Sequence, residues 1–450
     1  MNSAFIKNYS LELKQTLRLA FPIMLNQVGQ LMFGVLDSVM IGRVGAVPLA
    51  ASAFSNALFW FCLIFGIGVS NAISTLTAQA AGAAKPRDCG EVLRHGLVVN
   101  LVIGILLAGL LHLFTYHLDV FRQTPEIIEE SRTFLILIGW SGVFVLLFQN
   151  FRQFAEGLNQ TKPAMIMLGL GLLMNAFLNW LWIYGNWGFK AYGLTGAGFA
   201  TLVSRGVFTI MMMIYIIRSP LFTGHMPLKW WKAFERRWMA SILKLGLPGG
   251  FQYLFEVGAF TFAAMMMGWI GATELAAHQI AINLASITFM FAVGLATAAS
   301  IRGGYAAGKG NYHEARRVGF SSIILGAGGM SIFGLIFYFF REQLPRIYIH
   351  DVSVVHLASQ LLIVAACFQV FDGIQGVCVG ALRGLSDVKI PTIVSFFAYW
   401  VLSLPLGYYL GFHLNYGAIG LWTGLAIGLA VSAVLLTIRF HIISKKLCDV

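Results

Sequence analysis

Twelve long apolar runs dominate this sequence and restrict its fold more than any other feature. Each has about 20 residues or more, the length that an α-helix needs to cross ~30 Å of hydrocarbon. The chain is 58% hydrophobic and only 11% charged, whereas soluble domains are about 25% charged. The alternating strands of a membrane β-barrel, roughly ten residues each, are absent from the sequence. We therefore expect an all-α membrane protein with transmembrane helices near residues 16–40, 50–80, 95–114, 132–152, 163–184, 192–217, 240–267, 274–301, 317–340, 353–381, 390–411 and 416–439.

Lysine and arginine are distributed unequally between the predicted spans. Segments on the side of the N-terminus hold 23 of them, and the opposite segments hold six. Because cytoplasmic loops of membrane proteins are enriched in Lys and Arg, both termini are predicted to be cytoplasmic. This asymmetry accounts for the net charge of +12 without a nucleic-acid partner, since the basic residues are scattered. The five cysteines form no CxxC pair, which predicts neither disulfides nor structural zinc.

The second half of the chain repeats landmarks of the first. The pattern G-x-x-G-A-x-x-L-A-A occurs at Gly42–Ala51 and again, 226 residues later, at Gly268–Ala277. Further pairs in the same order are Pro22 and Pro248, Ala80–Gly82 and Ala306–Gly308, Gly157–Lys162 and Gly384–Lys389, and Tyr192–Gly196 and Tyr416–Gly420. Six spans per repeat give both halves the same orientation, which predicts two six-helix lobes related by a pseudo-two-fold axis along the membrane normal. The expected divisions are an N-terminal lobe at 1–217, a cytoplasmic interlobe linker at 218–239 and a C-terminal lobe at 240–450.

The connection between the lobes has two interpretations. Its centre reads HMPLKWWKAFERRW, a mixture of Trp, Lys and Arg. Such a mixture is typical of an amphipathic helix lying in the membrane interface. A plain linker anchored by interfacial tryptophans would have the same composition.

Ionisable residues inside the spans are the main functional candidates, because a charge in hydrocarbon costs several kcal/mol. Glu256 and Asp372 lie in the middle of their spans, and Asp37 lies closer to the outer interface. Arg205 is the one basic residue that we expect inside a span. A structural alternative is that one of the acids pairs with Arg205 or caps a broken helix. At the repeat interval, Ala263 corresponds to Asp37 and Gln30 to Glu256, so the acids do not belong to the duplicated scaffold.

Polar residues that could accompany Asp37 occur in the fifth and sixth spans. Asn175 and Asn179 are four residues apart and share one helix face. Thr195 begins the next span. Together these residues would form a pocket of carboxylate, amide and hydroxyl groups suited to a small hard cation or a proton network. The alternative is that the two amides only hold helices together.

The physical chemistry of a desolvated carboxylate indicates a transport mechanism. Such a group holds a proton more readily than it does in water, and it can also be neutralised by Na⁺ or by an organic cation. One carboxylate cannot bind a coupling ion and a cationic substrate at the same time with full affinity for both. That competition predicts antiport between two access states.

Enzymatic functions receive no support from the motifs of the chain. The sequence contains no GxSxG, HExxH or P-loop, and no GxGxxG after a strand, so we expect no enzyme, no ATP-driven pump and no cofactor. His278 lies in an Ala-Ala-His-Gln segment, where a structural hydrogen bond inside the span is favoured. A receptor or scaffold would not explain buried acids in both repeats.

The chain resembles the multidrug and toxic compound extrusion (MATE) family, and within it the NorM-like branch. The resemblance spans both repeats and rests on GRVGAVPLAA, FQYLFEVGAF, ATELAAHQIAINLASITFM and GLSDVKIP, with Pro22 and Asp37 in the first span. It implies an outward-facing, V-shaped pair of lobes that exports organic cations and amphipathic drugs in exchange for Na⁺ or H⁺. It further implies a monomer in the lipid bilayer of the bacterial inner membrane.

The resemblance also implies roles for particular residues. Asp37 would act with Asn175, Asn179 and Thr195 in the first lobe. Glu256 and Asp372 would form a cation site in the second lobe, with Na⁺ as its metal. Some members carry a tyrosine one turn before the tenth-span acid, where this chain has Phe368. That difference removes an oxygen ligand and weakens the expectation for Na⁺.

A flippase for lipid precursors or lipid-linked oligosaccharides is the principal alternative, because such proteins resemble this family in fold. It would need a cationic cavity for phosphate. The charges expected inside the spans are three acids against one arginine, which favours cationic cargo.

Overall fold

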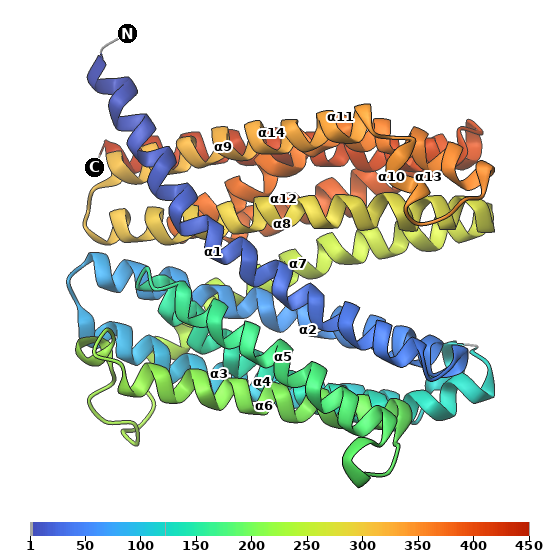
Figure 1. The fold of residues 1–450 in the computed structure, drawn as a ribbon. Coiled ribbons are helices and arrows are strands. Elements are labelled where there is room, and N and C mark those ends of the chain that lie inside the picture. Colours follow the sequence, from blue (N-terminus) through green and yellow to red (C-terminus); the bar gives the residue numbers. More distant parts are fainter. Residues whose placement is uncertain (1–2, 122, 450) are drawn as a thin grey trace. The chain divides into compact units, whose positions relative to one another are not determined.

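The computed structural model describes residues 3–121 and 123–449, with side chains from residue 11 onward, and no strand occurs among them. Within these described residues, twelve helices are long and apolar enough to cross a membrane (Figure 1). These are α1 (Ser3–Gly42), α2 (Ala46–Gly82), α3 (Pro86–Phe114), α4 (Pro125–Gly157), α5 (Lys162–Tyr184), α6 (Gly193–Arg218), α7 (Arg236–Ile270), α8 (Ala272–Gly308), α9 (Tyr312–Phe339), α11 (Val352–Gly384), a composite of α12 (Lys389–Phe396), η4 (Phe397–Ser403), α13 (Leu404–Tyr408) and η5 (Tyr409–His413), and α14 (Gly417–Cys448). The shorter elements are η1 (Leu118–Phe121), η2 (Asn186–Gly188), η3 (Thr223–His225) and α10 (Gln343–Arg346). The prediction of an all-α protein with twelve membrane-spanning helices is confirmed.

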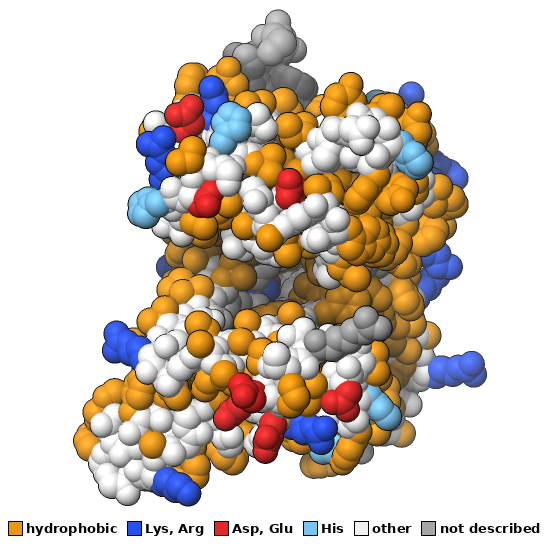
Figure 2. All heavy atoms as spheres, turned by 90° about the vertical axis from the view of Figure 1, so that its right-hand side faces the viewer, with side chains coloured by type: hydrophobic (Ala, Val, Ile, Leu, Met, Phe, Trp, Pro, Cys, Tyr) orange, Lys and Arg blue, Asp and Glu red, His pale blue; other side chains and the backbone are white. Residues whose placement is uncertain are grey.

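The outer surface of the helices is largely apolar. Many large aliphatic and aromatic side chains are exposed on it, among them Leu173, Phe339 and Ile332. Such a surface would be unfavourable in water but suits contact with lipid. Figure 2 looks instead toward one set of helix ends, where acidic, basic and histidine side chains lie among hydrophobic ones.

Contacts divide the chain into two compact units. The first unit is Leu25–Gly250, and the second unit combines Met1–Met24 with Phe251–Val450. Each division falls two residues after a proline inside a helix, Pro22 in α1 and Pro248 in α7. Proline removes a backbone hydrogen bond and bends a helix, so α1 and α7 each contribute to both units. The lobes at 1–217 and 240–450 follow the sequence repeat and stay a prediction.

The first part of α1 is held in the second unit by polar contacts with α8. The Arg302 guanidinium donates to the Glu12 carboxylate and, over 2.6 Å, to the Thr16 hydroxyl. Closer to the proline, Met24 packs against Gly294. These contacts stabilise the packing of the beginning of α1 against α8.

The first part of α7 packs in the first unit against α2. A β-carbon added at Gly68 would lie 2.7 Å from the Cα of Gly250, so the two helices cross with their backbones in direct contact. Gly246 packs equally closely against Val69. Small residues at a crossing allow this approach between membrane helices.

The two units use the same packing scheme. In the first unit, α2 contacts α3 and α4, α4 contacts α6, and α6 contacts α5. In the second unit, α8 contacts α9 and α11, α11 contacts α14, and α14 contacts the composite helix from α12 to η5. Equivalent helices of the repeat thus make equivalent contacts, which extends the repeat from sequence motifs to helix packing.

The connection between α6 and α7 forms no α-helix, so the amphipathic-helix interpretation is wrong and the plain-linker interpretation holds. Arg94 of α3 donates to the backbone carbonyls of Lys232 and Ala233. His95 accepts a 2.9 Å hydrogen bond from the backbone N–H of Glu235. Because these backbone groups form hydrogen bonds with side chains of α3, they do not form the hydrogen bonds of a helix.

The exposed ion pair of this linker joins Lys232 Nζ and Glu235 Oε1 over 2.6 Å. Its hydrogen bond raises the pKa of Lys232 and lowers the pKa of Glu235. Exposure to solvent limits what such a pair contributes to stability.

Candidate functional site

A buried polar network in the first unit surrounds Asp37 of α1. Asn179 of α5 donates a 2.6 Å hydrogen bond from Nδ2 to Asp37 Oδ1. Thr201 of α6 donates a 3.2 Å hydrogen bond from Oγ1 to Asp37 Oδ2. All three side chains are buried. Each carboxylate oxygen therefore has a neutral donor from a different helix.

Asn175 extends this network along α5. Its Oδ1 accepts a 3.2 Å hydrogen bond from Asn179, one turn away on the same helix face. Its Nδ2 lies 3.4 Å from the Thr201 hydroxyl and 3.5 Å from the Ser204 hydroxyl. The structure thus brings together Asp37, Asn175 and Asn179 of the residues predicted for the first site.

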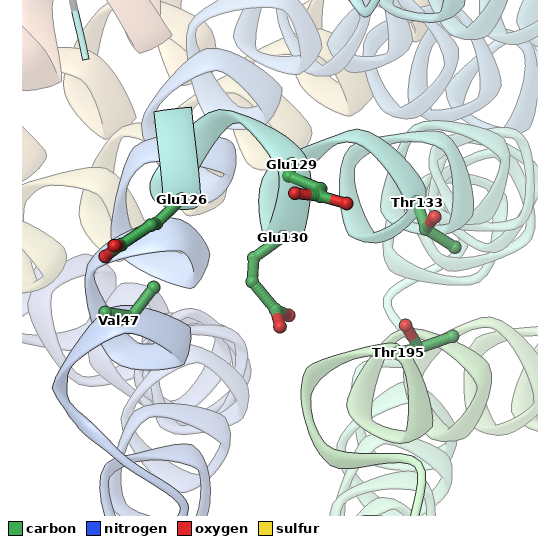
Figure 3. A pocket seen from close by; sticks show the side chains of 6 residues that line it. All are labelled: Val47, Glu126, Glu129, Glu130, Thr133 and Thr195. Carbon is green, nitrogen blue, oxygen red and sulfur yellow. The ribbon is translucent and has the colours of Figure 1, made fainter. Parts of the chain in front are cut away.

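Thr195 lies elsewhere. It lines a separate open cavity of about 510 Å³ together with Val47 of α2 and residues of α4 (Figure 3). The α4 residues are Glu126, Glu129, Glu130 and Thr133. Asn179 and Thr201 donate hydrogen bonds to Asp37. Thr201, six residues further along α6, therefore makes the contact that was expected of Thr195.

Arg205 lies near the Asp37 network without forming an ion pair with the acid. Its Nη1 donates to the Ser141 hydroxyl over 2.7 Å, and its guanidinium carbon lies 5.0 Å from the centre of the Phe59 ring. No Lys or Arg of the described part of the chain forms an ion pair with Asp37. A direct Asp37–Arg205 pair, the structural alternative for this acid, is therefore absent from the described residues.

The two acids of the second unit also come together. Glu256 of α7 interacts electrostatically with Asp372 of α11 and forms a side-chain hydrogen bond with Gln375, one turn beyond Asp372. Asp372 is buried and Glu256 is partly exposed. Neither acid forms an ion pair with a Lys or Arg within residues 11–121 and 123–449.

The composition of this second site suits a hard monovalent cation better than a transition metal. Within the described residues, no group of three or more His, Cys, Asp and Glu side chains gathers to hold a metal ion. Glu256, Asp372 and Gln375 instead offer carboxylate and amide oxygens, the ligand type that hard cations prefer.

The aromatic residues beside Asp372 have structural contacts. Phe368 is buried and lies 5.5 Å from Trp422 between ring centroids. Trp422 donates a 3.1 Å hydrogen bond from Nε1 to His278 Nδ1. The hydrogen bond expected for His278 inside its span is thereby confirmed, and Phe368 provides no oxygen at this position.

The expected inventory of charges inside the spans was incomplete. Helix α4 continues to Gly157, beyond the predicted end at residue 152, and buries both Arg152 and Glu156. Arg152 Nε lies 3.1 Å from Glu156 Oε1, although the N–H does not point at that oxygen and forms no hydrogen bond. Because this pair adds one charge of each sign, the excess of acids over bases inside the spans is unchanged.

Comparison with known proteins agrees with this architecture. The MatE family model matches residues 22–181 and 248–409. The two matches begin 226 residues apart, the interval of the internal repeat.

Individual relatives match almost the whole chain. "Probable multidrug resistance protein NorM" of Xylella fastidiosa (strain 9a5c) is 32% identical over 450 residues, which cover 99% of this chain and 95% of the relative. The protein of the same description from Mesorhizobium japonicum (strain LMG 29417 / CECT 9101 / MAFF 303099) is 36% identical, with 95% and 93% covered.

A solved structure supports the fold. "Crystal structure of MATE in the bent conformation" superimposes with a TM-score of 0.90 at 19% identity and covers 98% of both chains. With the repeated family match and the full-length relatives, this chain belongs to the MatE family and, within it, to the NorM-like branch.

Proposed function

We propose that this chain is a secondary active efflux transporter that exports organic cations and amphipathic drugs in antiport with Na⁺ or H⁺ by alternating access. The observation that carries the proposal is a set of acids, Asp37 in the first unit and Glu256 with Asp372 in the second, that form no ion pair with a Lys or Arg among the described residues. Acids inside membrane spans are costly and mark ion or substrate pathways. The relatives described as multidrug resistance proteins support the choice of cargo.

In the first unit, the donors to Asp37 are suited to exchange. Asn179 and Thr201 donate neutral hydrogen bonds and carry no charge that would compete permanently for the carboxylate. A proton, Na⁺ or an organic cation can replace one of these donors. Binding one of these cations reduces the affinity for the others, which is the requirement for antiport.

In the second unit, two acids share one site. Two neighbouring carboxylates without a basic partner repel each other when both are charged. A bound Na⁺ or proton relieves this repulsion. We therefore assign coupling-ion binding to Glu256 and Asp372.

Location and assembly belong to the same proposal. We propose a monomer in a bacterial inner membrane, with both termini in the cytoplasm, that acts as a transporter and not as an enzyme. The bacterial sources of the relatives and the distribution of Lys and Arg support this location.

A flippase for lipid precursors or lipid-linked oligosaccharides is the second candidate. Phosphate cargo calls for cationic side chains along the pathway. Arg152 is compensated by Glu156, and the acids that form no ion pair with a Lys or Arg of the described residues favour cationic cargo over phosphate.

Export of a cationic dye or a fluoroquinolone from vesicles tests the proposal, with Na⁺ and proton gradients imposed separately. At least one gradient should drive export by the parent protein. Asp37→Asn, Glu256→Gln and Asp372→Asn should each reduce export to the level of vesicles without the protein. Asp119→Asn, which changes an exposed acid outside the spans, is the matched control and should export normally.

Two results would contradict the proposal. Export by all three variants at the parental rate would remove the site assignment. Failure of both gradients to drive export by the parent would remove the antiport mechanism.

A further inference from the structure

Tyr399 is a completely buried phenol whose hydroxyl has no hydrogen-bond partner within the described residues. A buried hydroxyl without a partner costs about 1–3 kcal/mol. Native proteins satisfy nearly all such groups, and an exception calls for a water or ion at the site. The hydroxyl of Tyr399 therefore points to a ligand.

The backbone around Tyr399 is unusual. Residue 399 lies in η4 (Phe397–Ser403), a π-helical segment between the α-helical segments α12 and α13. π-Helical turns are rare, and they occur frequently at functional sites. The extra residue in such a turn changes the direction in which its side chains project.

Packing places Tyr399 at the Glu256–Asp372 site. Its ring centroid lies 6.1 Å from that of Phe260, which is one turn beyond Glu256 on α7. It belongs to the same buried cluster as Phe368, which is one turn before Asp372 on α11. Tyr399 also interacts electrostatically with both acids. The phenol ring thus packs against α7 one turn beyond Glu256.

The unpartnered atoms along this part of α11 are oxygens. Gln369 donates from Nε2 to Thr288 over 2.7 Å, while its Oε1 has no donor. Gln375 is hydrogen-bonded to Glu256, while its Oε1 also has no donor. Gln375 Oε1 and the Tyr399 hydroxyl are therefore buried neutral acceptors on residues that interact with the acids. Oxygens without donors beside paired carboxylates are the arrangement that a hard cation satisfies.

We propose that the Tyr399 hydroxyl is a ligand for a Na⁺ ion held by Glu256 and Asp372, and that it supplies the neutral oxygen that Phe368 cannot provide. This inference rests on the proposed coupling role of the two acids. The phenol adds a neutral oxygen ligand to the two carboxylates without adding further negative charge. The site is therefore built for Na⁺ as well as for a proton.

Na⁺ binding to the purified protein is the direct test, measured by ²²Na⁺ binding and by the rise in Tm on adding NaCl in place of choline chloride. A ligand that binds the native state raises its apparent stability. The parent should bind Na⁺, and Tyr399→Phe should weaken binding by roughly tenfold or more, as expected for loss of a contact to a charged group. The Tm measured without Na⁺ should remain parental, because the Tyr399 hydroxyl has no hydrogen-bond partner among the described residues that the substitution could remove. Tyr408→Phe, on the neighbouring segment α13, is the matched control.

Two results would overturn the inference. One is that Tyr399→Phe binds Na⁺ with the parental affinity while Glu256→Gln loses binding. That result would show that Na⁺ binds at the acids without the phenol. The other is the absence of Na⁺ binding by the parent. In the second case the proposed antiport survives if a proton gradient drives export, whereas failure of both gradients would remove the proposed function itself.

Discussion

Asn179 Nδ2 lies 2.6 Å from Asp37 Oδ1 and joins α5 to α1 inside the first unit. The second oxygen of Asp37 is bonded by Thr201 of α6. Three helices therefore converge on one carboxylate through neutral donors. A cation that binds Asp37 competes with these donors for the negative charge, which couples occupancy of the acid to the packing of these helices.

The contrast between Thr201 and Thr195 gives a matched pair of variants. Thr201→Val keeps the shape of the side chain but removes a donor to a buried carboxylate, a contact worth about 1.5–3 kcal/mol. We expect export to fall by roughly tenfold or more under this loss. Thr195→Val should have a smaller effect, because Thr195 lines the cavity beside Glu130. Vesicle export at equal protein levels is the measurement, and a larger loss for Thr195→Val would contradict the assignment.

The buried pair of Arg152 and Glu156 predicts a non-additive stability effect. Glu156→Gln leaves the Arg152 charge buried without its partner, which costs about 3–5 kcal/mol. Changing both residues to Met removes both charges and should cost much less. Tm values in detergent for the two single variants and the double variant check this prediction. Additive losses would indicate that the pair does not act as a unit.

The crossing of α2 and α7 is sensitive to side-chain volume. Gly68→Val would place its side chain against the backbone of Gly250 and should destabilise the protein by about 1–3 kcal/mol or more. Gly109→Ala, on α3 of the same unit, meets nothing within 4 Å and should be neutral or slightly stabilising, because glycine is unfavourable in a helix. Thermal unfolding followed by size-exclusion chromatography distinguishes the two outcomes. Equal Tm values would show that the crossing tolerates added volume.

Asp351 begins the helix that carries Asp372 and gives a pH-dependent prediction. Its carboxylate accepts hydrogen bonds from the Ser353 hydroxyl and from the backbone N–H groups of Ser353 and Val354, which lower its pKa below the ordinary 3.8. Because the folded-state pKa is lowered, the stabilisation is present above the ordinary value and is lost as pH falls through the lowered one.

Two substitutions separate capping from charge at this position. Asp351→Ala should lower Tm at neutral pH, and its deficit should shrink in acid. Asp351→Asn caps a helix about as well as Asp, so it should stay near the parent at neutral pH. A deficit for Asp351→Ala that does not change between pH 7 and acid would show that the charge is not involved.

The twelve helices, the two repeats and the three acids were all predictable from the sequence. Hydropathy and helix length are local properties, and a bilayer imposes the same requirement on every span. The spacing of Asn175 and Asn179 likewise fixes a shared helix face. The acids stand out because ionisable residues are rare inside apolar runs.

Only the tertiary structure decided which side chains meet these acids. Thr201 is 164 residues from Asp37 in the chain, and the choice between it and Thr195 depends on the depth and rotation of α6 against α1. Tyr399, which interacts electrostatically with Glu256 and Asp372, lies in a π-helical turn that hydropathy does not reveal. The pairing of Arg152 with Glu156 depended on how far α4 extends. The sequence determines which segments enter the membrane, because membrane insertion depends on the composition of each segment. Contacts between helices depend on crossing angles and axial shifts of the helices, which distant parts of the chain determine together.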